Sequence, residues 1–87
     1  MNYTILYSEA AIRDIPKLKS AKLDGKTKAL CESLSQNPIP SFSKQLVGSL
    51  RGKYSIRINL KHRLVYEILE DIKVVKILRL WSHYDDN

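Results

Sequence analysis

The residues with the clearest chemical potential are two arginines, a histidine and a tyrosine in the last third of the chain. They are Arg57, Arg63, His83 and Tyr84. Apolar and polar residues alternate before and after Lys61-His62, which predicts two strands joined by a tight turn and places these side chains on neighbouring strands. A guanidinium holds two phosphate oxygens at once, and an imidazole near its ordinary pKa donates a proton to a leaving oxygen. The combination suits phosphodiester chemistry on RNA.

Whether the two arginines lie side by side depends on the register of the predicted hairpin. In the first strand the alternation puts every second side chain on the apolar face, namely Tyr54, Ile56, Ile58 and Leu60. Arg57 then points to the opposite face, where Arg63 of the next strand is its neighbour if the register allows. Two adjacent guanidinium groups repel unless an anion lies between them, which favours a phosphate site. The alternative is that each arginine pairs with Glu67, Asp71 or Glu9 on a solvated face.

Other side chains near these arginines have two interpretations each. Lys44, Arg51 and Lys53 form a basic arc around the loop from Gly48 to Gly52, either as phosphate contacts that do not read RNA sequence or as a solvated charged loop. His83 and Tyr84 are either a proton donor and a stacking or phosphate-binding phenol, or an exposed chain end and a plug on the sheet edge. We expect His62 to support the hairpin and Trp81 to lie at the rim of the core.

Size and composition indicate one small globular domain over residues 1–87. The chain has 87 residues, 44% hydrophobic and 28% charged, with a net charge of +6. The charge favours a polyanion or an acidic protein as partner. Cys31 is the only cysteine, which excludes an internal disulfide and fits a reducing cytoplasm. The apolar stretches are far shorter than the ~20 residues that span a bilayer, so we expect neither membrane insertion nor secretion.

The expected fold is α+β. A β-rich stretch over residues 2–7 precedes Ser8, a candidate N-cap, and leucine and isoleucine spacing predicts helices over 8–19 and 20–36. Pro16 predicts a kink or a restart in the first helix. Short β-runs follow at about 43–47, 53–60, 63–69 and 73–80. They predict an antiparallel meander in a twisted sheet of four to five strands, with the helical hairpin packed on one face and the other face open.

Three segments give the chain a family resemblance. Residues 50–59, the run from His62 to Tyr66, and the closing His83-Tyr84 resemble the RelE/ParE superfamily of bacterial toxin–antitoxin systems, in particular its Txe/YoeB branch of ribosome-dependent mRNA interferases. The resemblance implies a RelE-like, microbial RNase-like fold and an endoribonuclease that needs no metal or other cofactor. The RNA's own 2′-hydroxyl would attack the adjacent phosphate.

The same resemblance assigns roles to residues. Arg63 would stabilise the phosphorane, His83 would act as general acid, Tyr84 would position the base or phosphate, and Arg57 would hold the RNA backbone. The chain departs from the YoeB branch at the general base, because Lys44 stands where that branch has a glutamate. The proton acceptor is therefore open, with Lys44, Asp85 and Asp86 as candidates.

The implied partners are an mRNA in the A site of the 30S ribosomal subunit and a cognate antitoxin that is acidic and partly disordered. Operator DNA would be contacted only through the antitoxin complex, and the toxin would form either a homodimer or a hetero-oligomer with its antitoxin. Two other functions stay open: a ParE-like, non-catalytic inhibitor of DNA gyrase, and an inactive protein that serves as antitoxin partner and co-repressor.

Overall fold

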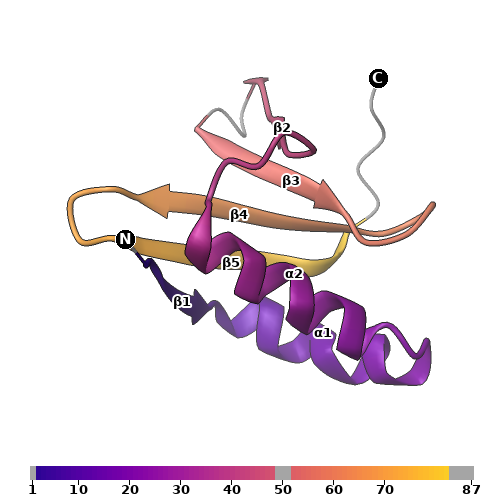
Figure 1. The fold of residues 1–87 in the computed structure, drawn as a ribbon. Coiled ribbons are helices and arrows are strands. Elements are labelled where there is room, and N and C mark those ends of the chain that lie inside the picture. The colour runs from indigo at the N-terminus through magenta and orange to yellow at the C-terminus, as the bar shows by residue number, and fades with distance from the viewer. Residues whose placement is uncertain (1, 49–51, 83–87) are drawn as a thin grey trace.

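The computed structural model describes residues 2–48 and 52–82, which form a strand, two helices and four further strands (Figure 1). The strands are β1 (Thr4–Tyr7), β2 (Lys44–Gln45), β3 (Lys53–Arg57), β4 (Arg63–Leu69) and β5 (Val74–Ser82), and the helices are α1 (Glu9–Ser20) and α2 (Asp24–Gln36). Among these residues no helix is long and apolar enough to span a membrane.

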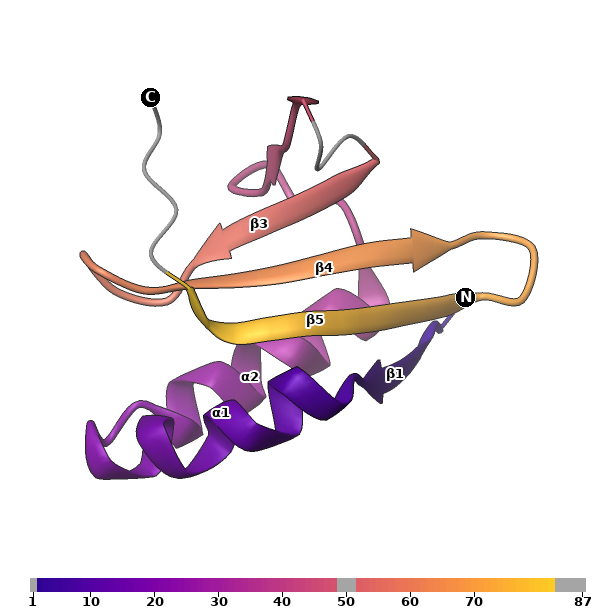
Figure 2. The same cartoon turned by 180° about the vertical axis from the view of Figure 1, so that it is seen from behind.

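The sheet confirms the expected α+β architecture. Its five strands are ordered β1-β5-β4-β3-β2, with β1 parallel to β5 and every other pair antiparallel. The meander is therefore present, and the N-terminal strand extends it on the far side of β5. The helix α2 lies in front of β5 in Figure 1 and behind it in Figure 2, so the helices cover one face of the sheet.

The core lies between that face and the helical hairpin. Its buried side chains come from α1, α2, the three long strands and the start of the β3–β4 connection: Ala11, Leu18, Cys31, Leu34, Ile56, Ile58, Leu64, Tyr66, Val75, Ile77 and Leu80. The predicted place of Leu60 on the apolar face was wrong, because Leu60 is 89% exposed, and Ile12 of α1 is 54% exposed as well. The buried stripe of α1 instead runs through Ala11, Asp14 and Leu18, which places a carboxylate in the apolar face.

The two helices begin and end where local hydrogen bonds dictate. The prediction that Ser8 is the N-cap of α1 is confirmed, because its Oγ accepts a hydrogen bond from the Ala11 N–H at 3.1 Å. The predicted restart at Pro16 is wrong, because α1 is continuous from Glu9 to Ser20, with Ala11 and Leu18 in the core on either side of the proline. The second helix begins later than predicted, since Lys22 adopts a left-handed conformation (φ 59°) that ends the first one.

The β3–β4 connection is longer than the predicted Lys61-His62 turn. β3 ends at Arg57, and residues 58–62 form a loop in which Asn59 Oδ1 accepts hydrogen bonds from the backbone N–H groups of Lys61 (2.9 Å) and His62 (2.8 Å). The Ile58 N–H closes the loop by donating to the His62 carbonyl at 2.8 Å. An asparagine side chain that replaces backbone partners in this way lets a five-residue loop compete with a two-residue turn.

Tyr66 anchors the segment that leads into β2. Its hydroxyl donates to the Pro38 carbonyl at 2.7 Å, and burial raises the pKa of Tyr66 to about 12, so the hydroxyl stays a donor. We expect Tyr66→Phe to lower the free energy of unfolding by about 1 kcal/mol, the net value of one such bond. Urea denaturation measures this. The control is Tyr54→Phe, which changes the stacked neighbouring ring (centroids 5.6 Å apart) but keeps the Pro38 bond. An equal loss in both variants would contradict the assignment.

Candidate active site

Arg57, Arg63 and Ser82 form one row across three strands. Arg57 lies directly opposite Arg63 between β3 and β4, and Arg63 lies opposite Ser82 between β4 and β5. The flanking residues Ile56 and Leu64 belong to the core under the helices, so this row lies on the other face of the sheet. Directly opposite side chains have Cβ atoms about 4.5–5.5 Å apart. The predicted neighbourhood of the two arginines is thus confirmed.

Lys44 belongs to the next row on the same face. It lies opposite Ser55, and Ser55 lies opposite Val65. The side chain of Ser55 is fully buried, and its Oγ accepts a hydrogen bond from Arg63 Nη1 at 3.0 Å. This bond fixes the guanidinium of Arg63, which is only 7% exposed. The structure therefore brings Lys44, Arg57 and Arg63 together around Ser55.

Lys53 lies on the same face, one row further from Arg63. It is opposite Glu67, which in turn is opposite Lys76. A carboxylate between two lysines on adjacent strands balances their charge. The role of Lys53 as a phosphate contact stays a prediction. Three other predicted site residues, namely Arg51, His83 and Tyr84, lie outside the described residues, as do Asp85 and Asp86.

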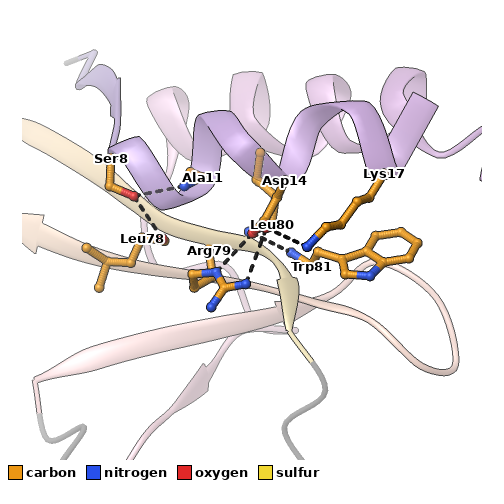
Figure 3. A network of polar contacts seen from close by, with 8 residues as sticks. All are labelled: Ser8, Ala11, Asp14, Lys17, Leu78, Arg79, Leu80 and Trp81. Carbon is orange, nitrogen blue, oxygen red and sulfur yellow. Dashed lines mark hydrogen bonds and ion pairs between the residues drawn. The ribbon is translucent and has the colours of Figure 1, made fainter. Parts of the chain in front are cut away.

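Asp14 of α1, which the sequence reasoning did not single out, organises the end of β5 (Figure 3). It is 2% exposed, and its Oδ2 accepts from the backbone N–H groups of Leu80 (2.9 Å) and Trp81 (3.1 Å). Both carboxylate oxygens also accept from the Arg79 guanidinium, at 3.0 Å and 3.2 Å. Lys17 Nζ lies 3.8 Å away.

The reason for this carboxylate lies in the sheet. β1 pairs with β5 only as far as Ile77, so the rest of β5 lacks a strand on that side. Ser8 Oγ donates to the Leu78 carbonyl at 2.8 Å, and Asp14 accepts from the next free N–H groups. The side chains of Asp14 in α1 and of its N-cap Ser8 thus replace the missing strand and satisfy a sheet edge that would otherwise expose unpaired backbone groups. The hydrogen bonds of Ser8 and Asp14 therefore fix the backbone of β5 as far as Trp81.

Asp14 also makes stability depend on pH. Burial by itself raises the pKa of Asp14, but the hydrogen bonds from Arg79, Leu80 and Trp81 outweigh it and hold that pKa below its ordinary value. A carboxyl with a lowered folded pKa contributes stability above its unfolded pKa of ~3.9 and loses it as pH falls through the folded value. We expect the urea midpoint to fall more steeply below about pH 4 in the wild type than in Asp14→Asn. Parallel curves would contradict this role.

The sequence does carry a signal for Asp14. It lies three residues after Ala11 and four before Leu18, which is the spacing of one helix face. An acid on an apolar helix face predicts that its carboxylate is paired with a cation or accepts hydrogen bonds from backbone N–H groups. Arg79 in the last strand is the cation. Ser55 had no comparable signal, because its contact with Arg63 depends on register.

The chemical capacity of the site is recognition of an anion. A guanidinium can hold two phosphate oxygens at once, so two of them directly opposite each other on adjacent strands can bind one phosphate. Arg57 is exposed, with its Nη1 3.4 Å from the Leu60 carbonyl, while Arg63 is held inside the sheet by Ser55. The site thus combines one fixed and one accessible guanidinium.

Comparisons with known proteins agree with this architecture. A model of the family described as ParE toxin of type II toxin-antitoxin system, parDE, matches residues 5–87. The structure is similar to a YoeB/ParE toxin from Agrobacterium tumefaciens (20% identity, 93% of this chain and 99% of that one, TM-score 0.83). No curated protein is similar enough to count as a relative.

Two further similar structures are toxin–antitoxin complexes. One is a YoeB–YefM complex from Staphylococcus aureus (29% identity, 97% of this chain and 100% of that one, TM-score 0.78). The other is a RelBE complex from Mycobacterium tuberculosis (31% identity, 97% of this chain and 100% of that one, TM-score 0.77).

Proposed function

Because the chain belongs to the RelE/ParE superfamily of toxins of type II toxin–antitoxin systems, in its YoeB-like branch, we propose that it is a ribosome-dependent endoribonuclease that cuts mRNA in the A site of the 30S subunit. The observation that carries the proposal is the row of Arg57, Arg63 and Ser82. It places Arg63 opposite Ser82, the residue that precedes His83 in the sequence, and Arg57 on the other side of Arg63.

In the proposed reaction the RNA supplies its own nucleophile. The 2′-oxygen forms a bond to the adjacent phosphorus, the bond from phosphorus to the 5′-oxygen breaks, and the products are a 2′,3′-cyclic phosphate and a 5′-hydroxyl. Negative charge grows on the phosphate oxygens in the transition state, where a preorganised cation stabilises it most. Arg63 has this role because Ser55 fixes its guanidinium. Arg57 holds the backbone of the RNA.

The leaving 5′-oxygen takes up a proton, and His83 is the proposed donor. In the sequence His83 directly follows Ser82, the residue opposite Arg63. An imidazole with an ordinary pKa near 6.5 is protonated often enough at neutral pH to donate. Tyr84 is proposed to position the base or the phosphate.

Lys44 replaces the glutamate of the YoeB branch, and we assign it to phosphate binding. A lysine side chain contacts phosphate as a compact point charge and does not read RNA sequence. We expect Lys44→Ala to raise KM with little change in kcat. Lys19→Ala, which removes an exposed lysine of α1, is the control and should change neither. A large fall in kcat, with loss of the pH dependence attributable to the base, would identify Lys44 as the proton acceptor instead. Asp85 and Asp86 are the remaining candidates.

The proposed protein partner is a cognate antitoxin. The YoeB and RelBE structures above were determined with their antitoxins bound. A net charge of +6 favours an acidic segment that covers the basic face of the sheet and folds as it binds. Contact with operator DNA would then come through the antitoxin complex, in the cytoplasm.

Inhibition of DNA gyrase is the second candidate, because the matching family model carries the ParE description. The two functions differ in what purified toxin does. A nuclease cuts a reporter message in a translation extract, with breaks mapped by primer extension, and leaves gyrase supercoiling intact. A gyrase inhibitor blocks supercoiling and leaves the message whole. We expect the first result.

A further inference from the structure

The β3–β4 loop stacks on the end of β5. The His62 and Trp81 rings have centroids 3.7 Å apart and planes inclined by 20°. His62 is 7% exposed, and Trp81 directly precedes Ser82, the residue opposite Arg63. We infer that the His62–Trp81 stack fixes the end of β5 at Ser82 opposite Arg63, which makes His62 a positioning residue of the proposed site. The inference rests on the proposed nuclease function.

The loop holds the His62 ring in place. The His62 N–H donates to Asn59 Oδ1 at 2.8 Å, and the His62 carbonyl accepts from the N–H groups of Ile58 (2.8 Å) and Asn59 (3.3 Å). The backbone of His62 is therefore bonded through both its donor and its acceptor. A ring carried on a backbone fixed in this way is a suitable support for Trp81, which is partly buried at the rim of the core, as predicted.

Trp81 is held from two sides. Its backbone N–H donates to Asp14 of α1, as Figure 3 shows, and its ring lies on His62 of the β3–β4 loop. The carboxylate fixes where the backbone lies, and the stack fixes how the strand is rotated about its own axis. These contacts are needed because the β4–β5 pairing shifts register between Arg63 and Val65, so the hydrogen-bond ladder alone does not set the direction of the strand there.

Loss of the stack should therefore displace the end of β5 relative to Arg63 and lower the rate of the reaction. A displacement of about 1 Å at a reacting group can lower a rate about 10²-fold, while substrate contacts elsewhere persist. The chain has a single tryptophan, so its fluorescence reports on the stack without a label.

The experiment compares His62→Ala, His62→Phe and Val75→Ala. We expect His62→Ala to lower kcat for message cleavage about 10²-fold with KM little changed, and to increase acrylamide quenching of Trp81. His62→Phe keeps a flat ring and should restore both. Val75→Ala removes core volume from the other end of β5, so it should lower Tm by at least as much as His62→Ala while kcat and quenching stay at the wild-type level.

Wild-type kcat in His62→Ala would overturn the inference. So would a His62→Phe variant with normal quenching but lost cleavage, because the imidazole itself would then be needed. If the wild-type protein cuts no message, the proposed function fails, and quenching alone decides whether the stack fixes the end of β5: increased quenching in His62→Ala supports it, and unchanged quenching overturns it.

Discussion

Arg63→Ala is expected to lower the rate of message cleavage by about 10²–10³-fold, equivalent to about 3–4 kcal/mol of transition-state stabilisation. Arg63 is buried at 7% exposure and is bonded to Ser55, so its charge acts from a fixed position in a poorly hydrated site. Single-turnover cleavage of a ribosome-bound reporter message measures the rate.

The controls separate charge from folding. Arg13→Ala removes an exposed guanidinium that has only a 3.8 Å contact with Glu9, and should leave cleavage unchanged. Arg63→Lys keeps the charge but loses the planar, two-point geometry, so we expect it to recover only part of the rate. Far-UV circular dichroism checks that each variant is folded. A folded Arg63→Ala variant with wild-type cleavage would remove Arg63 from the mechanism.

Asp14→Ala is expected to cause the largest loss of stability. It leaves the Leu80 and Trp81 N–H groups without their acceptor, at about 1–3 kcal/mol each if they stay buried. Arg79 is 43% exposed and regains water, so the lost ion pair adds little. The sum is about 2–6 kcal/mol, and a loss of about 3 kcal/mol corresponds to a fall in Tm of about 12–24 °C for a domain of this size.

Lys17→Ala is the matched control for Asp14→Ala. It removes the exposed partner of the same carboxylate, 3.8 Å away, and leaves the backbone contacts intact. The Tm of Asp14→Ala should lie below that of Lys17→Ala by most of the fall predicted for Asp14→Ala, as measured by thermal melts. Equal melting temperatures would mean that the edge of β5 does not depend on the carboxylate.

Period-two alternation was enough to predict which residues of β3 and β4 face the helices, and hence that Arg57 points away from the core. It was not enough to predict the loop, because Asn59 supplies side-chain acceptors that a pattern of apolar residues does not record. Arg57 and Arg63 nevertheless lie on adjacent strands as predicted, since the five-residue loop and the shorter β3 place them directly opposite each other.

Asp14 and Ser55 show what sequence pattern leaves out of the site. The role of Asp14 follows from the point where β1 stops pairing with β5, and the role of Ser55 follows from the register of β3 against β4. Both are tertiary facts. Residue types indicated the kind of chemistry, and contacts between distant segments determine which groups are fixed well enough to perform it.

The most direct test of the account is the chemistry of the RNA ends produced when purified toxin acts on a ribosome-bound message. We predict breaks within the A-site codon that carry a 2′,3′-cyclic phosphate and a 5′-hydroxyl, present with wild-type protein and absent with Arg63→Ala and with His83→Ala. An intact message with the wild-type protein, or breaks that persist at the same rate in both variants, would contradict it.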